Sequence, residues 1–321
     1  MQILINFVKP IIFFALGCLL LWVAFQGINL SDFQNTLSSI PLHLVCVSML
    51  LGYLAFVFRG LRWQLLINPL GFNPRRFDLV HAIAFGYLFN SFIPRSGELA
   101  RCTALNKVTQ IPVSKLFGHV LLERLIDFIL LAFCIAASLL LNYQDFLNFS
   151  KIISIPKYIY LYIALFMCIL IIFYKLRNRF FSISRLDKIK TFIKGIKTGF
   201  GSIKNIPNKP LFLIYTLLIW ICYLFMTVVC FYCFSETKDL SLGQGLFILV
   251  AGGLGMIVPT PTGMGSYHYL VIQALMILNI SREISQFFAI IVHSSQAIMI
   301  IVSGLVAMIV LYNRKSNNTY E

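Results

Sequence analysis

One short stretch, NSFIPRSGELAR, combines charge with helix-breaking residues at the end of an apolar segment. Arg95 and Arg101 carry planar guanidinium groups, which match the oxygens of a phosphate. Glu98 lies three residues from each arginine and is predicted to hold both guanidinium groups in place. Pro94 should end or kink the preceding helix, and Gly97 should permit a sharp turn before a new helix begins. The free N–H groups of that helix start favour an anion, so the stretch is predicted to bind a phosphate-bearing head group.

A second charged group lies inside the apolar segment HVLLERLIDFILLAF. Each charge near the centre of a bilayer costs about 2.5–3.5 kcal/mol, so these groups should be paired. Glu123 and Asp127 share one helix face, and Arg124 reaches Asp127 at i,i+3. Pairing with Arg95 or Arg101 would relieve the cost, which predicts one shared polar cavity. The alternative for this segment is a purely structural ion pair. The alternative for the NSFIPRSGELAR stretch is an interfacial loop whose arginines extend to lipid phosphates.

Two further motifs stand beside these groups. FRGLRWQLL places Arg59, Arg62 and Trp63 at the predicted cytoplasmic end of a span, where a positive-inside anchor with an interfacial aromatic residue explains most of the pattern. A head-group role for Arg62 is the secondary interpretation. GMIVPTPTGMGSYHYL is a second broken element, and its candidate binding residues are Pro259, Pro261, Gly263, Gly265 and His268.

Other chemistry finds little support in the sequence. Ser266 with His268 or His293 would suit an intramembrane serine hydrolase, but no motif supplies the oxyanion donors that it needs. Cys230 and Cys233 form a CxxC without a second pair or nearby histidines, which argues against zinc or redox chemistry. We therefore predict no catalytic residue, no metal and no cofactor.

The composition identifies the class of protein. Hydrophobic residues make up 59% of the chain and charged residues only 12%, whereas soluble domains carry about 25% charged residues. This indicates an all-α polytopic membrane protein. Its first apolar run is too long for a typical signal peptide and lacks a small-residue cleavage site. Six full spans of roughly 20 residues are predicted, at residues 8–26, 42–58, 117–141, 158–174, 211–234 and 285–311.

Two apolar segments are ambiguous, 79–94 and 242–279, because proline and glycine interrupt them. Residues 175–210 form a basic loop with ten basic residues against one acid, which suits the anionic cytoplasmic leaflet better than nucleic acid. If both ambiguous segments dip in and return, nearly all loop lysines and arginines share one side. We therefore predict two re-entrant elements, cytoplasmic N- and C-termini and the cell inner membrane, with two short spans as the alternative for 242–279.

The order of these segments suggests an internal symmetry. Residues 1–312 are predicted to form one membrane domain, followed by a cytoplasmic tail at 313–321. Its halves, 1–145 and 155–312, each contain two spans, a re-entrant element and a final span, in opposite orientations. Inverted repeats whose broken helices meet near the midplane are an architecture of transporters.

The blocks FRGLRW, PRSGELAR, ERLID and VPTPTGMGSYH, in that order, resemble the flippase-type membrane domain of the lysylphosphatidylglycerol synthase/flippase family, over nearly the whole chain. The resemblance implies movement of aminoacylated or other anionic lipids across the inner membrane by two re-entrant elements. It also implies a set of residues that line the path: Pro94, Arg95, Gly97, Glu98 and Arg101, with Glu123, Arg124 and Asp127 beside them. The opposing broken helix would be formed by Pro259, Gly263 and Gly265.

Two departures from the family pattern matter. Tyr267 and His268 stand where the family often has a glutamate, which suggests different head-group chemistry. The resemblance covers the membrane domain without the aminoacyl-transfer domain, so lipid synthesis is not expected.

The sequence thus favours a lipid translocase that takes a lipid with a phosphate-bearing head group. The alternatives are a membrane transferase acting on a lipid carrier and a scaffold for lipid-modifying enzymes. The expected partners are anionic or aminoacylated lipids and no nucleic acid, with a homo-oligomer or a lipid-synthesising partner protein left open. No P-loop is present, so ATP is not expected to drive movement directly.

Overall fold

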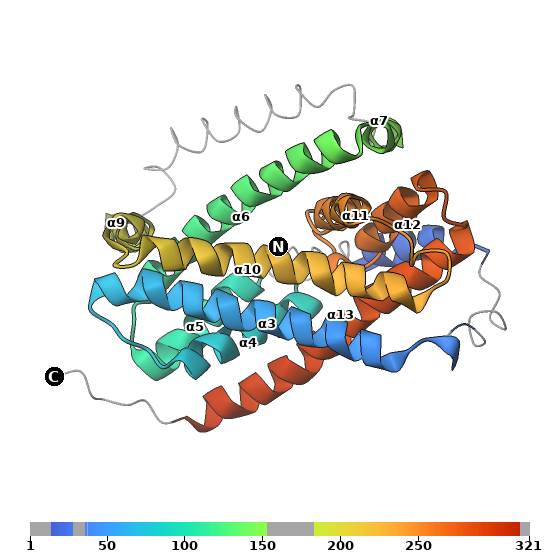
Figure 1. Ribbon diagram of the computed structural model, residues 1–321. Helices are drawn as coiled ribbons and strands as arrows, with labels where there is room; N and C mark the ends of the chain where they lie inside the picture. Colours follow the sequence, from blue (N-terminus) through green and yellow to red (C-terminus); the bar gives the residue numbers. More distant parts are fainter. Residues whose placement is uncertain (1–13, 28–35, 37, 153–182, 315–321) are drawn as a thin grey trace.

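The computed structural model describes residues 14–27, 36, 38–152 and 183–314 (Figure 1). Every regular element in these ranges is a helix, which confirms the predicted all-α class. The α-helices are Phe14–Ala24, α3 (Leu42–Ile67), α4 (Arg76–Phe92), α5 (Gly97–Thr109), α6 (Val113–Leu141), α7 (Tyr143–Ile152), α9 (Ile183–Gly201), α10 (Lys209–Val228), α11 (Leu242–Gly255), α12 (Ser266–Ile277) and α13 (Arg282–Asn313). Short 3₁₀ turns cover Asn68–Leu70, Ser202–Asn205, Val229–Cys233 and Pro261–Gly263.

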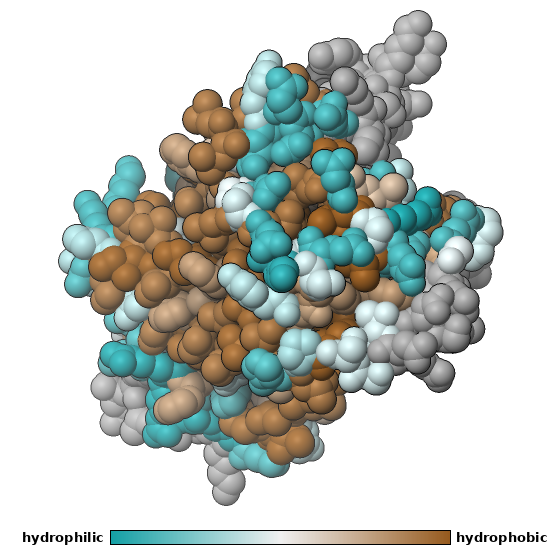
Figure 2. Space-filling model, turned by 45° about the vertical axis from the view of Figure 1, so that its right-hand side comes forward, coloured by the Kyte–Doolittle hydropathy of each residue, from teal (hydrophilic) through white to brown (hydrophobic). Residues whose placement is uncertain are grey.

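Four helices in this part of the chain, α3, α6, α10 and α13, are long and apolar enough to cross a bilayer, two of them with the 3₁₀ turn that follows. Their outward faces carry large apolar side chains; on α6, Phe133 is 67% exposed and Leu140 80% exposed. On the face drawn in Figure 2, apolar residues cover a broad area between hydrophilic patches. Such a surface is stable against lipid chains, so the chain is a multi-pass membrane protein.

The predicted spans agree with these helices except in length. The span predicted at 42–58 continues to Ile67 as α3, and those predicted at 117–141, 211–234 and 285–311 correspond to α6, to α10 with its 3₁₀ turn, and to α13. Of the span at 8–26, the described part forms the helix Phe14–Ala24. The span at 158–174 lies outside the described residues, so the count of six spans and the inverted repeat remain predictions.

The first broken element is a helical hairpin formed by α4 and α5. It begins and ends beside the C-terminal end of α13. Asp78, at the start of α4, pairs with Arg314 at 2.6 Å. Lys107, near the end of α5, places its ammonium 4.9 Å from the ring centre of Tyr312. The hairpin therefore enters and leaves at one end of the helix bundle.

The turn of this hairpin differs from the prediction in one respect. α4 ends at Phe92, two residues before Pro94, and α5 begins at Gly97, as expected. The left-handed residue is Arg95, with φ 64°, rather than Gly97. Gly97 is required for close packing, because a Cβ there would overlap the carbonyl oxygen of Gly86 on α4. The predicted role of Gly97 in the turn is therefore wrong.

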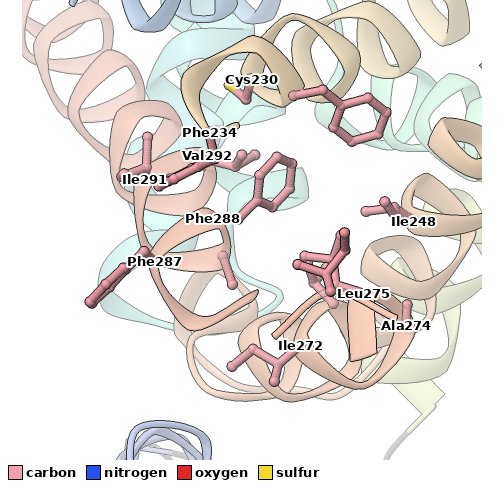
Figure 3. Packing of buried hydrophobic residues seen from close by; sticks show 14 of the residues in the cluster. Cys230, Phe234, Ile248, Ile272, Ala274, Leu275, Phe287, Phe288, Ile291 and Val292 are labelled. Carbon is pink, nitrogen blue, oxygen red and sulfur yellow. The ribbon is translucent and has the colours of Figure 1, made fainter. Parts of the chain in front are cut away.

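The second broken element is the hairpin of α11 and α12, and both of its ends lie at the opposite end of the bundle. Asn142, just after α6, donates to the carbonyl of Gly243 at 2.9 Å. Ser281, between α12 and α13, donates to Glu236 at 2.9 Å. Buried side chains from α11, α12, α13 and the 3₁₀ turn that follows α10 pack together around Phe288 (Figure 3). This core fixes the second hairpin against the long helices.

Part of the predicted basic loop is also helical. α9 lies within it and is seen nearly end-on in Figure 1, where α3 and α10 run across the view. It packs against the N-terminal part of α6 through glycines, since a Cβ at Gly199 would meet Gly118 and the carbonyl of Lys115. The predicted loop at 175–210 thus contains a helix, α9, which runs across the bundle at the same end as the first hairpin. We call it the cross-helix.

Candidate functional site: a buried arginine–carboxylate network

Asp127 on α6 is the centre of a buried charge network. Arg59 on α3 donates to its Oδ2 at 2.9 Å, and Arg62 donates to its Oδ1 at 3.0 Å. Arg124 lies 3.8 Å from the same carboxylate, as the i,i+3 spacing predicted. Arg59 also donates to the hydroxyl of Tyr223 on α10 at 2.8 Å. One carboxylate therefore joins three arginines from two helices.

Glu123 forms the second half of the network, one helical turn earlier on α6. Arg101 from α5 donates to Glu123 Oε2 at 2.5 Å, and Glu123 is fully buried. The Nε of Arg62 lies 4.0 Å from the other oxygen of Glu123. Arg101 also stacks over the ring of Trp63, with its guanidinium carbon 4.7 Å from the ring centre. The predicted pairing of the α6 acids with the PRSGELAR element is confirmed for Arg101.

At its outer edge the network is open. Arg124 lies 3.5 Å from Glu98, and the two side chains are 41% and 21% exposed. The exposed Arg95 instead reaches the second hairpin, donating to the carbonyl of Ile257 at 2.5 Å. Glu98 therefore does not clamp Arg95 and Arg101 as predicted, because each of those arginines finds a nearer acceptor on another element.

The role predicted for FRGLRW as a cytoplasmic anchor is wrong. Arg59 is 3% exposed, and Arg62 and Trp63 are fully buried. The reason is the presence of two carboxylates on α6, which offset the desolvation cost of both guanidinium groups. Arg59 and Arg62 are three residues apart, so one face of α3 presents both to α6.

Positive charge exceeds negative charge in this network. Four arginines (Arg59, Arg62, Arg101 and Arg124) face three carboxylates (Glu98, Glu123 and Asp127). Several of the guanidinium N–H groups are buried without a hydrogen-bond acceptor: Arg59 Nη1, Arg62 Nε and Nη2, Arg101 Nε and Arg124 Nε. An excess of cations with unused donors is the arrangement that an anion with several oxygens would complete.

The start of α5 is only partly available to such an anion. The backbone N–H of Gly97 donates to the side-chain oxygen of Asn90 at 2.7 Å. Asn90 was missed in the sequence, although it stands seven residues before Gly97 in the same quoted stretch. Part of the predicted helix-start site is thus satisfied within the hairpin, and the guanidinium groups are the main free donors.

The predicted residues of the second hairpin form a separate cluster. Pro259 is half-buried and Pro261 is buried, at its tip. Gly263 and Gly265 have φ of 78° and 82°, which glycine adopts without strain. His268 is buried and accepts from the backbone N–H of Gly265 at 3.3 Å. These residues shape the second hairpin, and near its tip the carbonyl of Ile257 accepts the hydrogen bond from Arg95 of the first hairpin.

Ser266 does not have the contacts of a nucleophile. Its hydroxyl lies 2.7 Å from the carbonyl of Gly255 and 3.2 Å from the hydroxyl of Thr260. His293 instead contacts the carbonyl of Thr262 at 3.0 Å. The serine therefore ties the two helices of the hairpin together, and its geometry does not support the hydrolase alternative. Within the part of the chain that the structure describes, no group of histidines, cysteines and acids could hold a metal ion.

Comparison with known proteins now gives the family. The model of the lysylphosphatidylglycerol synthase TM region matches residues 10–304. The chain belongs to this family. This agrees with the resemblance noted from the sequence blocks, and every charged residue of the network lies within the matched range of the lysylphosphatidylglycerol synthase TM region.

A relative is similar to this chain over a comparable range of residues. A UPF0104 membrane protein of Methanocaldococcus jannaschii is 23% identical over 339 aligned positions, which cover 96% of this chain and 96% of the relative. Similarity to this archaeal protein thus extends over nearly the whole length of both chains. No solved structure matches the chain.

Proposed function

We propose that this member of the lysylphosphatidylglycerol synthase TM region family is a lipid translocase. It moves a lipid with a phosphate-bearing head group between the leaflets of the cell inner membrane. The observation that carries the proposal is the buried excess of arginines with unpaired N–H donors. A buried cationic site inside a membrane domain is costly unless it serves a ligand or a conduction path.

In the proposed cycle the head group first meets the open edge of the network. Arg124 and Arg95 contact the phosphate there, and the deeper guanidinium groups supply further donors. The acyl chains remain in the bilayer, so only the head group needs a polar route. The two hairpins enter from opposite ends and touch between Arg95 and Ile257. A head group bound to Arg95 would compete with that carbonyl and loosen the contact between the hairpins.

The orientation belongs to the same proposal. The basic cross-helix α9, the start of α4 and the end of α13 lie at one end of the bundle, and a cytoplasmic position of that end follows the positive-inside rule. Both termini would then be cytoplasmic. Movement is downhill or coupled to protons, since no nucleotide-binding motif is present in the sequence.

Leaflet exchange in liposomes tests the function. Wild-type protein reconstituted with a fluorescent anionic phospholipid should make inner-leaflet label accessible to dithionite. Arg95→Gln and Arg124→Gln should each slow exchange by roughly 10- to 100-fold, because a charge-assisted hydrogen bond is worth about 1.5–3 kcal/mol. The side chains of Arg95 and Arg124 are at least partly exposed, so replacing either with glutamine should leave the fold intact.

The matched control is Arg282→Gln, which neutralises an exposed arginine at the start of α13, away from the network. Its exchange rate should equal that of the wild type. Exchange that stays at the wild-type rate in both Arg95→Gln and Arg124→Gln would refute the translocation route. A wild type that moves neither anionic nor aminoacylated lipid would leave the transferase and scaffold readings.

A further inference from the structure

A cleft between α3, α4 and α13 lies apart from the arginine–carboxylate network. Its volume is about 340 Å³, near the lower end of the roughly 300–1,000 Å³ typical of ligand sites. The residues that line it are mostly apolar: Met49, Tyr53, His81, Met299, Val302, Ser303 and Val306. The two methionines can adjust their shape to a flexible apolar ligand.

Two close helix contacts frame this cleft. α13 approaches α4 at Gly304, where a Cβ would lie 2.5 Å from the Cβ of Leu88. α13 approaches α3 at Gly52, where a Cβ would lie 2.9 Å from the end of the Met299 side chain. Gly304 therefore brings α13 close to α4, whereas the space over Gly52 is filled by the ends of the Gln296 and Met299 side chains of α13.

The cleft faces the side of the bundle that lipid covers. Val302 and Val306 are 57% and 49% exposed, and both belong to the membrane-spanning helix α13. A lipid chain can therefore reach the cleft from the bilayer. The arginine–carboxylate network lies on another side of α4. Gly86 of α4 faces α5, which carries Arg101, whereas Ala84 and Leu88 face α13.

Basic residues stand at one end of the cleft. His81 in its lining follows Asp78 by one helical turn, and Asp78 pairs with Arg314 at 2.6 Å. Arg75 and Arg76 precede them on the surface, both exposed. Three arginines thus accompany one aspartate where α4 begins and α13 ends. An apolar cleft with cations at one end is complementary to an amphiphile with an anionic head.

We infer that this cleft binds one acyl chain of an anionic phospholipid. The head group of that lipid lies against Arg75 and Arg76, in the leaflet at the Arg314 end of the bundle. This is a second lipid site, and it does not rest on the translocase function.

Photo-crosslinking tests the site. The full chain is placed in nanodiscs of phosphatidylcholine with a small fraction of phosphatidylglycerol that carries a diazirine in one acyl chain. After irradiation, adducts mapped by mass spectrometry should concentrate on the peptides that contain Met49–Tyr53 and Met299–Val306. Ser303→Trp and Val306→Trp each fill the cleft and should remove most of these adducts.

Ile301→Trp is the matched control, since Ile301 is exposed on the opposite side of α13. It should leave labelling unchanged. Adducts spread evenly over the lipid-facing helices, or kept by both cleft variants, would mean annular lipid only and would overturn the site. The same photolabel on phosphatidylcholine should give several-fold fewer adducts; equal labelling would overturn the anionic preference. Crosslinking needs no leaflet exchange, so its failure and that of the translocase proposal are separable.

Discussion

Asp127→Leu is expected to lower the free energy of unfolding by about 3–5 kcal/mol, because it leaves buried arginines without their shared carboxylate. Arg59 and Arg62 both donate to Asp127, and both are almost fully buried. Leucine is similar in size, so lost packing contributes little. Denaturant or thermal unfolding of the purified protein in detergent measures the change.

A compensated variant separates charge from packing. Replacing the two arginines as well, in Arg59→Met/Arg62→Met/Asp127→Leu, should recover most of the lost stability, because apolar groups of similar volume can replace a buried ion network. It should not recover leaflet exchange. A single Asp127→Leu variant as stable as the wild type would show that the network does not hold α3 to α6.

Gly97→Ala is expected to destabilise the first hairpin by about 1–3 kcal/mol, the usual cost of overpacking a close contact. The added Cβ would overlap the carbonyl oxygen of Gly86 and lie 2.7 Å from the Asn90 side chain. A backbone carbonyl cannot rotate away, so α4 and α5 must separate. Because Arg101 is on α5, the same change should pull its guanidinium from Glu123 and slow leaflet exchange.

Gly201→Ala serves as the control for this change. Gly201 ends α9, and a Cβ there meets nothing within 4 Å. Alanine has the higher helix propensity, so this variant should be at least as stable as the wild type. Equal stability of the Gly97 and Gly201 variants would contradict the close contact between α4 and α5.

The sequence predicted the parts of the site that follow from local spacing. The i,i+3 pair of Arg124 and Asp127 and the start of α5 at Gly97 depend only on nearby residues. Pairing between Arg101 and Glu123 was also predictable, because buried charges in an apolar segment need a partner. The all-α membrane class follows from composition alone.

The long-range parts could not be predicted in the same way. Arg59 and Arg62 stand where an interfacial anchor is usual, and only their approach to α6 shows that they are buried. Nothing local indicates that Arg95 bonds to a carbonyl 162 positions away. One signal for the burial of Arg59 and Arg62 was present in the sequence. Their Arg-x-x-Arg spacing places both side chains on one face of a helix that continues past the predicted span.

The bond between Arg95 and Ile257 has a consequence for how mutations are tolerated. On one side it depends on a guanidinium group, which only arginine provides. On the other it depends on a main-chain oxygen, which every amino acid provides. Ile257 can therefore be replaced by other amino acids without loss of the hydrogen-bond acceptor. A saturation mutagenesis map should be lopsided here, intolerant at position 95 and permissive at 257, and would understate what the second hairpin contributes.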